Sequence, residues 1–358
     1  MYFCENHFTM LENAHPGRTE LNELGEFGLI DRLTAGVGTN NPSTLKGIGD
    51  DAAVINNGDK LTLVSTDLLI EGIHFDMAFT PLKHLGYKAA VVNFSDIFAM
   101  NGTPQQLFVG ISVSNRFSAE ALDELYAGIK LACQHYKVDP AGGDTTSSPH
   151  GLFLALTVTG IADNQKVVYR STARPNDLIC VTGDLGAAYT GLLMLEREKQ
   201  VFLSNPEMQP DLEEHDYIIG RQLKPEARGD IIKKLEQSGI IPTAMIDISD
   251  GLASEILHIC HNSKTGCRIY EDKIPIDSMT VSTAEEFNIS PVTAAMNGGE
   301  DYELLFTIRM EDYEKIRSFE EVSLIGHITA EDEGCNLVTS DNVLVEIQAQ
   351  GFDHMKDN

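Results

Sequence analysis

The chain has 358 residues and carries a net charge of −28, with 54 acidic residues against 26 basic ones. This charge excludes nucleic acid as a favoured partner, because a phosphate backbone is bound by basic surfaces. The length is more than one small core can organise and predicts two domains, while a hydrophobic content of 42% is ordinary for a globular protein.

Nothing in the sequence predicts export or insertion into a membrane. The first 22 residues contain neither the basic segment nor the apolar segment of a signal peptide. The longest apolar stretch, residues 151–162, is shorter than the ~20 residues that span a bilayer. We therefore expect a cytoplasmic protein with no membrane partner.

The six cysteines form no CxxC pair, and none lies near a histidine at the spacing of metal ligands. In a cytoplasmic protein this pattern favours reduced thiols that are buried or idle.

Strands and helices are expected to alternate in the first half of the chain. Ser118 is a suitable N-cap for one helix, and Gly102 a suitable end for another. The expected strands are residues 61–67, 106–113 and 151–160, and the expected helices are residues 82–102 and 119–136.

A second sequence unit begins near residue 163. Alternating strands and helices continue, which indicates an α/β or α+β fold. We expect an N-terminal arm (1–24), an N-terminal domain (25–163) and a C-terminal α/β domain (164–358). Residues 200–225 are acidic and are expected to form a surface excursion. The expected strands here are residues 244–249 and 303–308, and the expected helices are residues 183–199 and 250–261.

Acidic residues recur in glycine-rich loops and at strand ends. Asp50 and Asp51 follow two glycines in GIGDDAAV, where the backbone can approach a ligand closely. Asp67 ends a strand after Ser65 and Thr66, and such oxygen-rich groups suit Mg²⁺. A turn or a helix cap is the alternative for each motif taken alone.

Two further acids lie between these motifs and the middle of the chain. Asp96 lies within an otherwise apolar helix, one turn after Asn93, and a carboxylate there is costly unless it is paired or bound to a metal. Asp144 follows two glycines in AGGDTT, for which a plain turn is the alternative.

The strongest local signal is MIDISDGL, in which a strand runs through Asp247 and Asp250 into a helix. The amide groups at a helix start can receive a phosphate, although Asp250 or Ser249 could equally be an N-cap. Glu300 and Asp301 precede another strand in NGGEDYELLF, where a surface turn is the alternative.

These acids lie in six motifs and act together only if the fold gathers them. Carboxylates so gathered repel one another and are tolerable around hard cations such as Mg²⁺. The sequence therefore predicts a site for several cations, built from both halves of the chain.

The motifs, in this order, resemble the thiamine-monophosphate kinase family of the aminoimidazole-ribonucleotide-synthetase-like superfamily. The resemblance runs from about residue 25 to 308. The matching stretches are GEFGLIDRL, GIGDDAAV, STDLLIEGIHF, YKAAVVNFSDIFAMNGTP, GGDTT, VTGDLG, MIDISDGL and GGEDYELLFT.

The resemblance implies a two-domain synthetase-like fold. Its N-terminal domains have mixed sheets that join into a barrel across a homodimer, and α/β C-terminal domains flank them. It also implies Mg²⁺-dependent transfer of the γ-phosphate of ATP to thiamine monophosphate, giving thiamine diphosphate, in a cytoplasmic enzyme of thiamine biosynthesis. No protein base is expected, because the attacking phosphate is already mostly ionised near pH 7.

The resemblance also implies three groups of site residues. The Mg²⁺ ligands would be Asp51, Ser65, Thr66, Asp67, Asp96, Asp144, Asp247 and Asp250. The ATP contacts would be Tyr126, Gly143, Asp144, Arg170 and Ser249. The thiamine phosphate contacts would be His74, Glu300 and Phe352. Asp50 and Asp301 are left without a role.

Two alternatives remain at this point. One is another ATP-using member of the superfamily, such as aminoimidazole ribonucleotide synthetase. The other is a non-catalytic divalent-metal-binding protein, although six retained acidic motifs argue against a decayed site.

Overall fold

The computed structural model describes residues 21–208 and 210–350, which fall into two units. One unit includes residues 21–38 and contains the helix α1 (Leu21–Thr34), interrupted at Gly25, where φ is 66°. The other includes residues 39–350 and contains every other helix and strand of the described chain. The expected N-terminal arm up to residue 20, and Phe352, lie outside the described residues.

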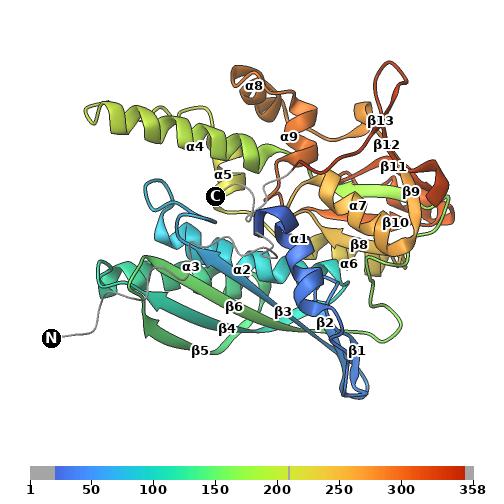
Figure 1. The fold of residues 1–358 in the computed structure, drawn as a ribbon, viewed down its shortest axis with the longest axis horizontal. Helices are drawn as coiled ribbons and strands as arrows, with labels where there is room; N and C mark the ends of the chain where they lie inside the picture. The colour runs from blue at the N-terminus through green and yellow to red at the C-terminus, as the bar shows by residue number, and fades with distance from the viewer. Residues whose placement is uncertain (1–20, 209, 351–358) are drawn as a thin grey trace, which may run out of the picture. The chain divides into compact units, whose positions relative to one another are not determined.

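A six-stranded sheet forms the first half of the larger unit (Figure 1). Its strand order is β1-β2-β3-β6-β4-β5, antiparallel throughout except that β5 runs parallel to β4 at the edge. The strands are β1 (Thr44–Lys46), β2 (Ala53–Asn56), β3 (Leu61–Ile70), β4 (Thr103–Val113), β5 (Asp139–Ser147) and β6 (Leu152–Ala162).

Two helices cover one face of this sheet. The helix α2 (Leu82–Ala99) lies directly on the strands, and α3 (Ala119–Tyr136) packs against α2 (Figure 1). A Cβ at Gly128 of α3 would lie 1.9 Å from the carbonyl oxygen of Lys83, so the two backbones meet where no side chain fits. α2 is buried on nearly all sides, as expected of a helix that is apolar all round.

A seven-stranded sheet forms the second half, in the order β13-β12-β9-β11-β7-β10-β8. Among the described strands of this sheet, only β12 and β9 pair in parallel. The strands are β7 (Leu178–Thr182), β8 (Ala244–Asp247), β9 (Thr265–Tyr270), β10 (Leu304–Ile308), β11 (Val322–Ala330), β12 (Cys335–Val338) and β13 (Leu344–Glu346).

Seven α-helices and three short 3-10 helices complete the described part of this half. None of the described helices is long and apolar enough to cross a membrane. The helices are α4 (Ala187–Ser204), α5 (Asp216–Leu223), α6 (Gly229–Gln237), α7 (Leu252–Ser263), α8 (Ser278–Glu286), α9 (Pro291–Asn297), α10 (Tyr313–Ile316), η1 (Glu271–Lys273), η2 (Met310–Asp312) and η3 (Glu331–Glu333).

The interior strand β7 contributes to two hydrophobic cores. Its residues are all buried, and they alternate between the cores: Leu178 and Cys180 pack into the one that surrounds α2, while Ile179 and Val181 pack into the one beneath α7. The boundary expected near residue 163 falls between the last strand of the first sheet and β7. The division into two domains there stays a prediction.

Most expected elements are present with shifted ends, and the Ser118 cap is confirmed, since its Oγ accepts from the Ala121 amide. The AGGDTT segment is not a turn but part of β5. The surface excursion expected over residues 200–225 is wrong for its last part, because Ile218, Gln222 and Leu223 of α5 are buried.

Candidate active site

Four aspartates from four separate elements converge inside the larger unit. Asp51 precedes β2, Asp67 lies on β3, Asp96 lies on α2 and Asp247 ends β8. Carboxylate oxygens of Asp51, Asp96 and Asp247 all lie within 4.8 Å of one another, and Asp67 interacts electrostatically with Asp96 and Asp247. We call these four residues the carboxylate cluster. It joins both halves of the chain, as the sequence predicts.

Hydroxyl groups and one guanidinium hold three members of the cluster. Ser65 Oγ donates to Asp96 Oδ2 at 2.5 Å. Ser95 Oγ donates to Asp247 Oδ2 at 2.5 Å. Arg170 Nη2 donates to Asp51 Oδ1 at 2.7 Å. The fixed oxygens are therefore oriented before any ligand binds.

The cluster is short of positive charge. Burial, followed by repulsion from Asp247, raises the pKa of Asp67 to about 7. Burial also raises the pKa of Asp51 to about 8, although Arg170 opposes the shift. Burial and the neighbouring aspartates raise the pKa of Asp96 well above its usual range.

Two cluster oxygens, Asp51 Oδ2 and Asp67 Oδ2, are buried without a hydrogen-bond partner in the described structure. Unsatisfied carboxylate oxygens that repel one another suit a hard divalent cation, which takes oxygen ligands. The residues present therefore fit Mg²⁺.

Asp250 and Glu255 extend this acidic region at the start of α7. Glu255 Oε1 accepts from the Asp250 amide at 3.0 Å, so Glu255 closes the first turn of the helix. Glu255 is 3% exposed, and burial together with Asp250 raises its pKa well above the usual range. Ser249, an expected ATP contact, precedes Asp250 and accepts from the Glu300 amide through its carbonyl oxygen at 2.6 Å.

Asp50, which the sequence left without a role, holds Arg170. Its Oδ1 accepts from the Arg170 amide at 3.3 Å and lies 3.6 Å from Arg170 Nε. Lys46 Nζ lies 3.5 Å from the other oxygen, Oδ2. Asp50 and Asp51 thus both form ion pairs with Arg170, the expected ATP contact.

Three expected ligands or contacts lie apart from the cluster within this chain. Thr66 follows Ser65 on the opposite face of β3, and its hydroxyl bonds Leu156 O at 2.9 Å. Gly143 and Asp144 lie on β5, three strands from β3 in the sheet, or about 14 Å at the usual strand spacing.

Tyr126, a further expected ATP contact, lies on α3. Its ring packs, half-buried, against the core around α2.

Glu300 is held by two partly buried polar contacts that the sequence did not predict. Lys88 Nζ of α2 lies 2.8 Å from Glu300 Oε1, and Gln222 Nε2 of α5 donates to Glu300 Oε2 at 2.6 Å. Glu300 has a left-handed backbone, with φ at 58°, which is uncommon outside glycine and typical of a functional turn.

His74, the other described residue expected to contact thiamine phosphate, lies in the turn after β3. Its Nδ1 accepts from the Ile70 amide at 3.1 Å, which leaves Nε2 as the nitrogen that carries the proton in the neutral ring.

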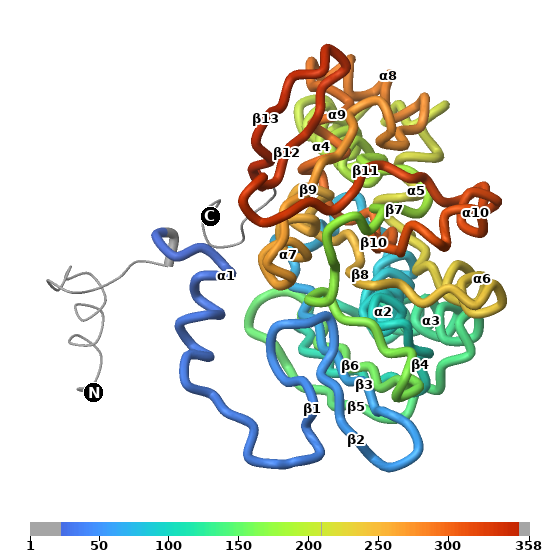
Figure 2. Tube along the Cα trace, turned by 90° about the vertical axis from the view of Figure 1, so that its right-hand side faces the viewer, coloured from blue at the N-terminus to red at the C-terminus, as the bar shows by residue number. Residues whose placement is uncertain are grey.

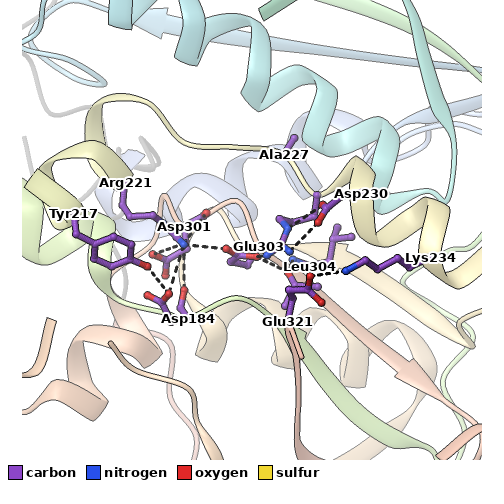
Figure 3. Close-up of polar contacts among 12 residues, drawn as sticks. Asp184, Tyr217, Arg221, Ala227, Asp230, Lys234, Asp301, Glu303, Leu304 and Glu321 are labelled. Carbon is purple, nitrogen blue, oxygen red and sulfur yellow. Dashed lines mark hydrogen bonds and ion pairs between the residues drawn. The ribbon is translucent and has the colours of Figure 1, made fainter. Parts of the chain in front are cut away.

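Asp301 belongs to a buried ion network beside Glu300 (Figure 3). Its carboxylate accepts from the Gly186 amide, before α4, at 2.8 Å. Arg221 lies between Asp184, Asp301 and Glu303, with Nη1 at 3.0 Å from Glu303 Oε1. Arg228 Nη1 donates to Glu303 Oε2 at 2.7 Å. Asp301 therefore fixes the loop that carries Glu300.

Lys88, Gln222 and Glu255 are among the polar residues at the site that sequence reasoning missed. Lys88 lies in a matched stretch, and a lysine within an apolar helix carries the same signal as Asp96. Glu255 lies five residues after Asp250, whereas a capping box has a spacing of three, so that pattern does not predict its contact. Gln222 offers no local signal.

Comparison with known proteins places the chain. The family described as "AIR synthase related protein, N-terminal domain" matches residues 49–162. Thiamine-monophosphate kinase of Buchnera aphidicola subsp. Schizaphis graminum is 34% identical over 339 residues, which cover 93% of this chain and 99% of that protein. The chain belongs to the thiamine-monophosphate kinase family. The kinase of Escherichia coli K12 is 34% identical, covering 92% and 98% of the two chains.

Solved structures of the family share the fold. A structure described as "AaThiL complexed with AMPPCP and TMP" matches with a TM-score of 0.79 at 30% identity, covering 94% of this chain and 99% of that chain. The thiamine monophosphate kinase of Aquifex aeolicus matches with a TM-score of 0.74 at 29% identity, covering 92% and 100%. The mixed α/β architecture expected from the sequence is thus confirmed.

Proposed function

We propose that this chain transfers the γ-phosphate of ATP to thiamine monophosphate and so makes thiamine diphosphate. The observation that supports this most is the carboxylate cluster of four aspartates, two of which have a buried oxygen without a hydrogen-bond partner in the described structure, in a chain of this family. A related structure was solved with AMPPCP and TMP. A site for ATP and an anionic acceptor in a chain of charge −28 calls for cations between protein and phosphates.

Asp51, Asp67, Asp96 and Asp247 would hold Mg²⁺, with Asp250 beside them. When bound, Mg²⁺ would offset the repulsion between the two phosphates and the charge that develops on the transferred group. The chain itself supplies positioning, because the phosphate nucleophile is already ionised and needs no base. Ser65 and Ser95 orient the oxygens of Asp96 and Asp247 for that purpose.

Arg170 would be the main protein cation at the ATP phosphates. In the described structure it pairs with Asp50 and Asp51, so it is already directed at the cluster. Glu300 would face the acceptor, and Lys88 with Gln222 would hold its carboxylate in place. Transfer would be direct and in line, without a phosphoenzyme.

The deciding experiment incubates the purified full-length protein with ATP, Mg²⁺ and thiamine monophosphate and measures thiamine diphosphate. Turnover of this acceptor supports the proposal. ADP formation only with formylglycinamidine ribonucleotide would assign the chain to the synthetase reaction instead, and no turnover with either acceptor would leave a binding role. A labelled phosphoprotein formed from ATP alone at a rate that matches turnover would contradict direct transfer.

We also propose a homodimer built on the first sheet. All nine residues of the edge strand β5 are exposed, and exposed edges pair readily with other chains. The face turned away from α2 carries Leu68, Phe108 and Phe153, exposed by 61%, 39% and 36%. An apolar sheet face beside a free edge suits a subunit interface. Sedimentation analysis at micromolar concentration tests it, and a monomer there would contradict it.

A further inference from the structure

Three cysteines from separate elements meet in the second sheet, on the side of β9 and β12 and away from β8. Cys260 lies in the last turn of α7, Cys267 lies on β9 and Cys335 begins β12. Their sulfur atoms all lie within 4.8 Å of one another. Figure 2 shows α7, β9 and β12 next to each other. The sequence predicts unrelated thiols, because the three residues belong to no common motif.

The spacing of the sulfur atoms suits a single metal ion. Three thiolates bound to one ion at about 2.3 Å lie about 3.8–4.0 Å from one another, so small rotations of these side chains would complete the site. The three residues are thus nearly preorganised for metal binding.

Glycines shape the backbone here: Gly266 allows the close approach of β12 to β9, and Gly334 has a left-handed φ of 67°. Each precedes a cysteine, in Gly266–Cys267 and Gly334–Cys335. A Cβ at Gly266 would lie 2.4 Å from the carbonyl oxygen of Gly334, which no substituted residue could accommodate without a shift. The Cys267 amide donates to the same oxygen at 3.0 Å. The backbone therefore fixes Cys335 beside Cys267.

The three cysteines differ in how far they are buried. Cys260 and Cys267 are buried in the core beneath α7, and Cys335 is half-buried, which leaves an approach on its side.

The number of ligands decides between soft metals. No histidine or carboxylate of the described chain joins the three sulfur atoms within that distance. Structural zinc sites are almost always completed by four protein ligands, whereas soft thiolate ligands also select Cu(I), which accepts three. We propose that Cys260, Cys267 and Cys335 form a three-thiolate binding site for Cu(I).

This inference goes beyond the proposed kinase reaction and does not depend on it. In the order of the second sheet, β11, β7 and β10 lie between β9 and β8, the strand that carries Asp247. Binding of Cu(I) would release the thiol protons to solvent and involves no oxidation or reduction of the protein.

The test titrates reduced full-length protein with Cu(I) under anaerobic conditions, in competition with bicinchoninate. We expect one Cu(I) per chain to be withdrawn from the chelator, near-ultraviolet absorption from thiolate-to-copper charge transfer, and a higher Tm. Cys335→Ala should abolish all three effects, and its own Tm without copper reports whether it folds. Cys133→Ala, which removes a buried thiol from α3, should leave them unchanged.

Four outcomes would overturn the proposal. They are failure of the folded protein to compete with bicinchoninate, copper binding by Cys335→Ala equal to that of the unaltered chain, preferential retention of Zn²⁺ when both metals are offered, and a disulfide among the three cysteines in protein isolated without oxidant.

Discussion

At the residue scale, Asp96 shows how a carboxylate placed in an apolar helix marks a candidate functional group. A carboxylate within an apolar helix is costly. In the described structure, repulsion from three other aspartates adds to that cost, and no basic side chain is found to offset it. Ser65 Oγ donates a hydrogen bond to its carboxylate in the described structure. The Asp96 carboxylate therefore lowers the stability of the fold, which points to a role in function.

Asp96→Asn should separate function from stability. The amide keeps the size of the side chain but loses the charge that would hold Mg²⁺, so kcat/KM for thiamine monophosphate should fall by more than about 100-fold, beyond the loss typical of residues that only orient metal ligands. The Tm should stay the same or rise, because repulsion with Asp67, Asp247 and Asp51 is relieved.

Asp59→Asn, in the exposed turn before β3, is the matched control and should change neither quantity. Normal turnover by the Asp96→Asn protein would remove Asp96 from the site.

His258 on α7 is expected to give the protein a measurable pH dependence. Burial, with Arg170 and His261 nearby, lowers its pKa to about 4, from an ordinary value near 6.5. Between these values the unfolded chain binds a proton that the folded chain does not, so the free energy of unfolding falls as the pH falls from about 6.5 to about 4.

His258→Gln should make the Tm less dependent on pH across this window, whereas His150→Gln, in an exposed loop, should not. Identical Tm profiles for the His258→Gln protein and the unaltered chain would contradict the assignment.

Single residues also show which contacts of the site could be predicted from the sequence and which could not. Asp51, Asp67, Asp96 and Asp247 were expected to gather, and they do. The pairing of Glu300 with Lys88 and Gln222 was not expected, because these two partners lie on α2 and α5, far from Glu300 in the chain. Such contacts depend on how helices and strands pack against one another, and local sequence patterns do not encode that packing.

At the scale of elements, α2 carries the site and its packing against α3 determines its position. Gly86 and Gly128 remove the side chains at this contact, and a Cβ at either would lie 1.9 Å from a carbonyl oxygen of the facing helix. A helix interior normally favours alanine over glycine by about 1 kcal/mol. At this contact the steric clash outweighs that preference.

Gly128→Ala should therefore destabilise the protein by about 1–3 kcal/mol, the usual cost of overpacking a core, as measured by urea denaturation. Gly220→Ala in α5 is the matched control, since nothing lies within 4 Å of its added Cβ, and it should be neutral or slightly stabilising. Equal effects of the two substitutions would show that α2 and α3 can move apart without cost.

Elements that depend on local periodicity were predicted well, and the others were not. The strand β3 and the helix α2 have clear apolar patterns, and each was expected at nearly its observed place. The strand β5 has the sequence DPAGGDTTS, whose glycines, proline and aspartates are typical of turns. Its parallel pairing with β4, which includes a register shift after Leu107, overrides that preference, and no local signal predicts the pairing.

At the scale of the whole molecule, the position of Asp144 raises a question that one chain does not answer. It is expected to be a metal ligand, yet it lies on the exposed edge strand, about 14 Å along the sheet from β3. If it acts at the cluster, a second copy of the chain must supply it. The homodimer proposed from the same exposed edge offers that arrangement.

Hybrid dimers test this arrangement. Asp96→Asn and Asp144→Asn homodimers should both be inactive. A hybrid of one Asp96→Asn and one Asp144→Asn chain, isolated through two different affinity tags, would have one site with both aspartates and one with neither if each site draws on both chains. We then expect about half the activity of the unaltered dimer, because one of two sites is intact. If each chain instead builds its own site, both sites carry one substitution and the hybrid is inactive. An inactive hybrid would therefore place Asp144 in the site of its own chain, and an active Asp144→Asn homodimer would remove it from the reaction.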